Sequence, residues 1–417
     1  MGEHMKIKIK KLTKKIKTNL SKQVQNLNLK DKKFNALELC LIIIMALITG
    51  VLAGEVCFSN EKTYKNSKEI REIQSVYNTL LNDYYGDLNE EKLEEAAING
   101  MMSLLGDKYS NYFDTETAEK FNEELDGTFT GIGIEVTNDA DGVPTVLTVI
   151  KDTPASKAGL KEGDKILKLD NEDVSKMKVT ELVKKIKGTN KVIELLIKRN
   201  EEELKISFST GKIEIQSVTK QIFEKENKKI GYIGISIFAL NTDEQFEEAL
   251  LELEQEGIDS LIIDVRNNSG GHLETVVNIA SLFIDKDNPI CQIKTKEKTN
   301  IIKSTKKTDR KYNVVVLANK SSASASELLV GSLKEIYNSD IIGETTYGKG
   351  TVQKTMTLSN GSMIKYTAET WLTAKGNSID KIGISPTIEV LQDENYYSNP
   401  STETDKQLQK AIEVLNK

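Results

Sequence analysis

Residues 321–327 read Ser-Ser-Ala-Ser-Ala-Ser-Glu, and residues 348–353 read Gly-Lys-Gly-Thr-Val-Gln. The serine cluster follows an apolar segment that we predict to be a strand and opens an apolar helix. The same alternation occurs on both sides of it, with predicted strands at 230–238, 260–265, 313–318, 341–343, 352–358 and 364–373 and predicted helices at 243–255, 272–284 and 326–336. This pattern predicts an α/β fold with a largely parallel sheet, whose functional groups lie at the carboxyl ends of the strands.

Ser324, in the middle of the cluster, is the candidate nucleophile. A serine between a strand and a helix is exposed near the positive end of the helix dipole, where free backbone N–H groups can stabilise an oxyanion. A second interpretation is structural, because Ser324 and Glu327 have the spacing of a capping box. The local sequence alone leaves both interpretations open.

Lys349 is the candidate general base. The chain has only two His, so a His-based triad would have to use His272. A Lys enclosed among small residues can lose its proton, because burial lowers its pKa. Gln353 lies four positions after Lys349, and on a strand both side chains would face the same side. A phosphate-binding loop is rejected, since Gly350 stands where that motif needs Ser or Thr.

Composition excludes several functional classes. The net charge is -6, and residues 1–35 carry eleven Lys against two acidic residues, so the remaining chain is strongly acidic and nucleic-acid binding is not expected. Two His and three Cys without a close pair support neither a multi-His metal site nor a disulfide framework, and no metal or other cofactor is expected. A thiol-dependent enzyme would have to use Cys291, which has no neighbouring base motif.

The N-terminal part predicts a membrane protein. A basic leader, residues 1–35, precedes the uncharged apolar run Leu39–Gly54, and we expect a transmembrane anchor over residues 36–58. Lys before the run and none directly after it predict a single-pass protein of the cell membrane, with a cytoplasmic N-terminus and an extracytoplasmic catalytic domain. A cleaved signal peptide is the alternative, with Val51-Leu52-Ala53 as its site.

Apolar residues recur at helical spacing across residues 60–125, which predicts a helical region that could serve in dimerisation or as a packed subdomain. Short strands and glycines follow over residues 126–212. The motif Thr153-Pro154-Ala155-Ser156-Lys157-Ala158-Gly159-Leu160-Lys161-Glu162-Gly163-Asp164 closely resembles the signature of PDZ domains. In such a module, Gly131, Ile132, Gly133 and Ile134 would cup a terminal carboxylate while the peptide adds as a strand. The glycines could instead serve only tight turns.

Taken together, five motifs resemble those of the carboxyl-terminal processing peptidases: Phe129–Gly133, the PDZ signature, Asp264-Val265-Arg266-Asn267-Asn268-Ser269-Gly270-Gly271, Ser322–Glu327 and Tyr347–Gln353. The resemblance implies Ser324 as nucleophile, Lys349 as general base and Gln353 as the residue that orients the Lys. It also implies an oxyanion hole of backbone N–H groups from Ala325 and from Gly270 or Gly271. Ser269, His272, Tyr347 and Thr387 depart from the family pattern, and none of them removes a catalytic group.

The resemblance implies a crotonase- or ClpP-like peptidase core over residues 213–390, an inserted PDZ domain and a helical tail over residues 391–417. We therefore expect a membrane-anchored serine endopeptidase that recognises protein C-termini, with a possible homodimer and a regulatory partner protein. The alternative is an inactive or gated PDZ scaffold that binds C-termini without cleaving them.

Overall fold

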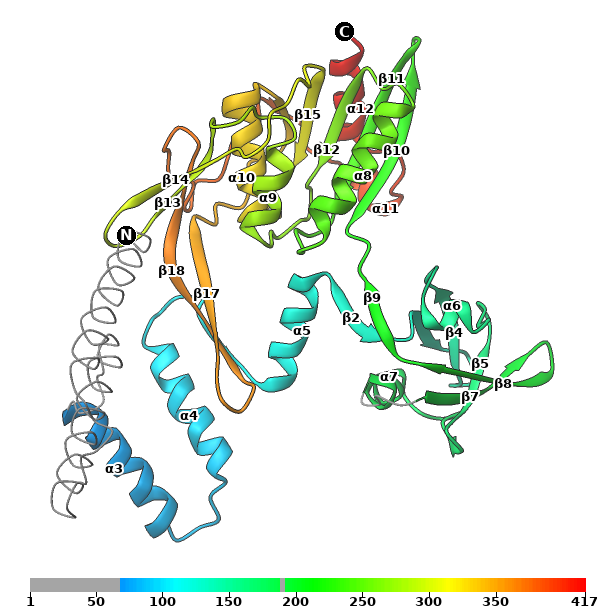
Figure 1. Ribbon diagram of the computed structural model, residues 1–417, viewed down its shortest axis with the longest axis vertical. Helices are drawn as coiled ribbons and strands as arrows, with labels where there is room; N and C mark the ends of the chain where they lie inside the picture. Colours follow the sequence, from blue (N-terminus) through cyan, green and yellow to red (C-terminus); the bar gives the residue numbers. More distant parts are fainter. Residues whose placement is uncertain (1–67, 188–191) are drawn as a thin grey trace, which may run out of the picture. The chain divides into compact units, whose positions relative to one another are not determined.

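The computed structural model describes residues 68–187 and 192–417 (Figure 1). The predicted leader and anchor, residues 1–58, lie outside this range. Within it, no helix combines the length and the apolar character needed to cross a membrane. The chain divides into two compact units, residues 1–94 and 95–417.

The first unit contains α3 (Lys68–Asp83), and α4 (Glu90–Ser103) begins in it and ends in the second. Neither helix has a buried residue, and several apolar side chains of α3 are exposed, among them Ile73, Val76 and Leu80. The region predicted to be helical over 60–125 is not helical throughout, because the short strand β1 (Asn111–Phe113) separates α4 from α5 (Thr115–Asp126). Asp114 begins α5 by accepting the Thr117 N–H, and Gly127 ends it in the left-handed conformation.

The predicted PDZ region forms a β-rich module. A two-stranded ribbon of β2 (Thr128–Gly131) and β9 (Gly211–Glu214) leads into and out of it. Its sheet has the order β3–β4–β5–β7–β8, with β6 beside β5, so β3 is an edge strand. The module contains β3 (Ile134–Asn138), β4 (Pro144–Val149), α6 (Pro154–Lys157), β5 (Lys165–Leu169), β6 (Glu172–Asp173), α7 (Val179–Lys187), β7 (Val192–Arg199) and β8 (Glu202–Ser209).

The peptidase region is built on a six-stranded sheet of order β10–β11–β12–β15–β16–β19. All neighbouring pairs from β11 to β19 are parallel, and only β10 is antiparallel, as the alternation of strands and helices predicted. The strands are β10 (Val218–Lys225), β11 (Lys228–Ile235), β12 (Ser260–Asp264), β15 (Asn313–Ala318), β16 (Asp340–Gly343) and β19 (Ile388–Glu389).

Apolar clusters cover both faces of this sheet, as a parallel sheet requires. One face packs against α8 (Thr242–Gln255), α9 (Leu273–Ala280) and α10 (Ala325–Ser332) through a large buried cluster. The other packs against α12 (Lys406–Asn416), which follows the short α11 (Glu394–Ser398) (Figure 1). The predicted helix over 326–336 is α10, and a π-helical turn, Leu333–Tyr337, continues it.

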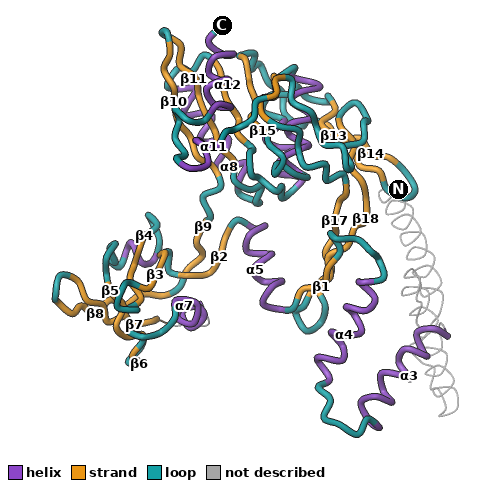
Figure 2. Tube along the Cα trace, turned by 180° about the vertical axis from the view of Figure 1, so that it is seen from behind, coloured by secondary structure: helices purple, strands orange, loops and turns teal. Residues whose placement is uncertain are grey.

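A second, antiparallel sheet was not predicted. In it β18 (Met363–Thr373) pairs with β1, with β13 (Pro289–Lys294) and with β17 (Thr351–Thr357), while β14 (Thr299–Lys303) pairs with β13 (Figure 2). β17 and β18 match predicted strands, whereas β1 lies in a region predicted to be helical. The pairing of these strands joins segments far apart in the sequence. Because β1 pairs with β18, residues 111–113, which precede the PDZ region in the sequence, form part of a sheet of the peptidase region.

Candidate active site

Ser324 lies between β15 and α10, at the carboxyl edge of the parallel sheet. Its backbone has φ 57° and ψ -115°, a sparsely populated conformation for a residue with a side chain. Such conformations persist where the surrounding structure enforces them, and they occur often at active sites. The residue is 9% exposed.

Three of the four serines of the cluster, Ser322, Ser324 and Ser326, differ in how their hydroxyl groups are used. Ser322 Oγ donates to the Val265 carbonyl at 2.7 Å, and Ser326 Oγ donates to the Asn268 carbonyl at 2.8 Å. Both flanking hydroxyls therefore tie the cluster to the loop after β12. Ser324 and Glu327 form the capping box that their spacing suggested, with the Glu327 carboxylate accepting the Ser324 N–H, yet Ser324 Oγ donates to no residue that the structure describes. Of the three, Ser324 alone keeps a hydroxyl available for chemistry.

Glu327, which sequence reasoning treated only as part of a capping box, connects the serine to the lysine loop. Its carboxylate is fully buried. Oε2 accepts the N–H groups of Ser324 at 2.8 Å and Lys349 at 2.9 Å, so one oxygen holds the backbones of both candidate residues. Oε1 accepts from Thr346 Oγ1 at 2.6 Å and from the Gly348 N–H at 2.7 Å. Four donors thus surround one buried charge, which the burial of a carboxylate requires.

Lys349 is half-buried in the loop before β17. Its Nζ lies 5.0 Å from the centre of the Tyr109 ring, a residue that sequence reasoning missed. Burial and the charge of Lys365 lower the pKa of Lys349, while Tyr347, Glu327 and Asp107 act in the opposite direction. The net lowering favours the neutral amine, which is the form that a general base needs.

The sequence argument that Lys349 and Gln353 face the same side requires both to lie on one strand. Lys349 precedes β17, which begins at Thr351, and the pairing of β17 with β18 is irregular between Val352 and Gln353, so that argument does not apply here. The Gln353 side chain donates through Nε2 to Thr351 Oγ1 at 2.9 Å and to Thr367 Oγ1 at 3.2 Å. Its Oε1 accepts no hydrogen bond within the described parts of the chain.

The glycine pair lies against the serine. A Cβ on Gly270 would come within 2.9 Å of Ser324 Cβ and 3.1 Å of the Ala325 nitrogen, and a Cβ on Gly271 would collide with the backbone of Phe238. The φ angles of Gly270 and Gly271, 113° and 146°, also favour glycine. The Gly270 N–H donates to Asn268 Oδ1 at 2.9 Å. The N–H groups of Gly271 and Ala325 donate to no acceptor in the described residues, which leaves Gly271 rather than Gly270 as the available glycine donor.

The residues proposed to cup a carboxylate lie at the junction of β2 and β3. Gly133, with φ 82°, separates the two strands. The Ile132 carbonyl accepts from the Ala155 N–H, and the Ile132 side chain is buried. The N–H groups of Ile132 and Gly133 have no acceptor within residues 68–187 and 192–417. Ile134 opens the edge strand β3.

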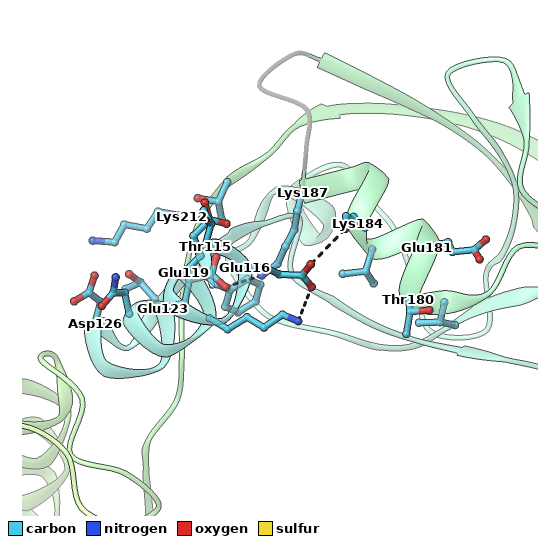
Figure 3. A pocket seen from close by; sticks show the side chains of 17 residues that line it. Thr115, Glu116, Glu119, Glu123, Asp126, Thr180, Glu181, Lys184, Lys187 and Lys212 are labelled. Carbon is cyan, nitrogen blue, oxygen red and sulfur yellow. Dashed lines mark hydrogen bonds and ion pairs between the residues drawn. The ribbon is translucent and has the colours of Figure 1, made fainter. Parts of the chain in front are cut away.

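A cavity of about 1310 Å³ lies between α5, β2 and α7 (Figure 3). Ion pairs connect the two helices across it: Glu116 with Lys184 at 3.4 Å and Glu123 with Lys187 at 2.6 Å. None of the candidate catalytic residues lines this cavity.

Cys291 lies in β13, and its side chain is fully buried. Burial raises the pKa of its thiol to about 12. A thiolate is therefore strongly disfavoured at neutral pH, which argues against the thiol-dependent alternative.

Comparison with known proteins identifies the family. Residues 229–390 match Peptidase family S41, residues 122–198 match the PDZ domain, and residues 52–117 match the N-terminal domain of the activating protease CtpB. The chain is 40% identical to the carboxy-terminal processing protease CtpB of Bacillus subtilis, over 81% of this chain and 71% of the relative. It is 34% identical to a probable CtpA-like serine protease of Staphylococcus haemolyticus, over 93% of this chain and 78% of the relative.

Among solved structures, the photosystem II D1 C-terminal processing protease is 27% identical, with a TM-score of 0.46 over 76% of this chain and 86% of that chain. The matches to the family models and the identity to the curated relatives cover both the PDZ region and the peptidase region, which the sequence motifs had singled out. The chain therefore belongs to Peptidase family S41, as a PDZ-containing carboxy-terminal processing serine peptidase.

Proposed function

We propose that this serine peptidase cleaves polypeptides with Ser324 as nucleophile and Lys349 as general base. In this mechanism Ser324 Oγ attacks the scissile carbonyl carbon while Lys349 Nζ takes the hydroxyl proton. The resulting ammonium then protonates the leaving amine, and a water molecule repeats the sequence on the acyl-enzyme. The N–H groups of Ala325 and Gly271 would stabilise the tetrahedral oxyanion.

One observation carries this assignment: a single oxygen of buried Glu327 accepts the N–H groups of both Ser324 and Lys349. The Ser324 hydroxyl, which donates to no described residue, and the lowered pKa of Lys349 support the same roles. Gln353 would orient the Lys349 amine through its free Oε1. That contact is part of the proposal and is not formed in this structure.

Recognition of protein C-termini would fall to the PDZ domain. The unused N–H groups of Ile132 and Gly133 suit a terminal carboxylate, and the free edge of β3 suits a peptide that adds as a further strand. The last residues of the substrate would then be bound apart from the catalytic residues, with the upstream chain delivered to Ser324.

We also propose that residues 36–58 anchor the enzyme in the cell membrane as a single-pass protein with a cytoplasmic N-terminus. The support is the sequence pattern of a Lys-rich leader before an apolar run. The exposed apolar side chains of α3 suit a homodimer or a regulatory partner, since large exposed apolar patches often serve as interfaces.

The test uses the full chain in detergent and one unfolded polypeptide in two forms, with a free C-terminal carboxylate and with a C-terminal amide. We expect cleavage of the free form, slower cleavage of the amidated form mainly through a higher KM, and no cleavage of either form by Ser324→Ala. Equal cleavage of both forms would contradict recognition of the carboxylate. Binding of the free form by the parent without cleavage would favour the gated scaffold.

A further inference from the structure

The segment Asp107–Ser110 lies between α4 and β1, outside every motif that the sequence had singled out. Pairing of β1 with β18 brings this segment against the strand that also pairs with β17. Thr367 of β18 donates its N–H to Ser110 Oγ at 3.0 Å. The segment is thus fixed beside Gln353 and Lys349, although it precedes both by more than 230 residues.

Asp107 is the centre of a small hydrogen-bond network in this segment. Its Oδ2 accepts from Thr367 Oγ1 at 2.5 Å and from Ser110 Oγ at 2.6 Å, and its Oδ1 accepts the Tyr109 N–H at 3.0 Å. Burial alone would raise the pKa of Asp107, but the hydrogen bonds from Ser110, Thr367 and Tyr109 together lower it. Asp107 is therefore a carboxylate at neutral pH and can only accept hydrogen bonds.

This restriction sets the direction of the next hydrogen bond. Because the Thr367 hydroxyl gives its single proton to Asp107, its oxygen can only accept from Gln353. Gln353 must then present its Nε2 to Thr367, as the 3.2 Å contact has it. Its carbonyl Oε1 consequently faces away from Thr367 and stays free to accept a hydrogen bond from an amine.

We propose that Asp107 is a positioning residue of the active site, acting through Thr367 to fix the amide of Gln353 with its carbonyl oxygen available to Lys349. This inference rests on the Ser–Lys–Gln assignment proposed above. Without an obligatory acceptor at position 107, the Thr367 hydroxyl could rotate and donate to Gln353, which would turn the amide over. The amide NH₂ of Gln353 would then face the Lys349 amine in place of the carbonyl oxygen, and it could not accept a hydrogen bond from that amine.

The test compares Asp107→Asn, Thr367→Val and the double variant in the full chain, with cleavage of β-casein as the readout. We expect each single variant to lower kcat by about 10- to 100-fold, a partial loss of the roughly 10²–10⁴-fold that a positioned acid–base group contributes, with KM changed less than about twofold. The double variant should be no slower than the slower single one, because both changes break the same chain of hydrogen bonds from Asp107 through Thr367 to Gln353. Independent, multiplying losses would overturn the proposal.

The pH profile separates positioning from a general loss of structure. Lys365, Tyr347, Glu327 and Asp107 are the charged and titratable groups that act on Lys349, besides the Tyr109 ring over its amine. Asp107 raises the pKa of Lys349, so Asp107→Asn should move the acidic limb of kcat to lower pH while the plateau falls. Thr367→Val should lower the plateau without moving the limb.

Asp114→Asn is the matched control. Asp114 lies on the other side of β1 and caps α5, and Asn is an equally good cap, so both kcat and the limb should stay as in the parent. The rate at which phenylmethylsulfonyl fluoride modifies Ser324 provides a second readout that needs no protein substrate. Parent-like kcat and labelling rate in Asp107→Asn would refute the inference. Full activity of Ser324→Ala would refute the assignment on which it rests.

Discussion

Glu327→Gln should weaken the fold and the active site together. The substitution keeps the shape of the side chain but replaces one carboxylate oxygen by an NH₂ group. Each oxygen of Glu327 accepts from two donors, so in either orientation of the amide two buried donors lose their acceptor. One orientation leaves the N–H groups of Ser324 and Lys349 without an acceptor, and the other leaves the Thr346 hydroxyl and the Gly348 N–H without one.

An unsatisfied buried donor costs about 1–3 kcal/mol, so two of them predict a loss of about 2–6 kcal/mol in the free energy of unfolding. For a unit of the size of the peptidase region, this loss lowers the midpoint of thermal unfolding by roughly 5–20 °C. Turnover should fall by at least about 100-fold even below the new midpoint, because the two loops that carry Ser324 and Lys349 lose their shared anchor.

Differential scanning calorimetry and the rate of sulfonyl fluoride labelling of Ser324 measure the two effects. Glu335→Gln is the control, because Glu335 also accepts two hydrogen bonds, from the Lys375 N–H and Asn377 Nδ2, but at an exposed site. It should shift the midpoint by only a few degrees and leave labelling unchanged. A Glu327→Gln protein with the midpoint and labelling rate of the parent would refute the reasoning.

Three further outcomes are expected. Tyr109→Ala should move the acidic limb of kcat to higher pH, because water reaches the Lys349 amine and its pKa rises, whereas Tyr109→Phe should not; an unmoved limb in Tyr109→Ala would contradict shielding by the ring. Cys291→Ala should keep activity within about twofold in the same cleavage assay, since a buried thiol takes no part in the reaction. Burial alone would raise the pKa of Asp405, but hydrogen bonding and the charge of Arg266 lower it below its usual value. The stability that their ion pair contributes should therefore fall as the pH drops below about 4. Urea unfolding at different pH should show a weaker fall in stability for Asp405→Asn than for the parent.

The parallel sheet could be predicted because its strands are buried on both faces and form apolar runs, such as Val314–Leu317 between helices. The antiparallel sheet could not. Its central strand β18 pairs with β1, whose three residues give too weak a local pattern to indicate a partner some 250 positions away. Irregular pairing between Val352 and Gln353 likewise has no sequence signal, so the spacing of Lys349 and Gln353 could not indicate which way the two side chains face.

The candidate site was predictable where a residue type itself implies chemistry, as for Ser324, Lys349 and the glycine pair. It was not predictable where function depends on tertiary contacts. Glu327 has the spacing of an ordinary helix cap, and only the folded chain brings the loop of Lys349 to both of its oxygens. Asp107 has no local signal at all, because its role depends on a hydroxyl group of β18.

The central claim is that Ser324 is a nucleophile activated by Lys349, and covalent labelling tests it most directly. The full chain and its Lys349→Met variant are treated with phenylmethylsulfonyl fluoride across a range of pH, and the modified residue is located by mass spectrometry. The account predicts modification of Ser324 in the parent, faster as the pH rises and the Lys349 amine deprotonates, with the rate reduced by at least about 100-fold in Lys349→Met. Modification of a different residue, or equal rates in the two proteins, would contradict it.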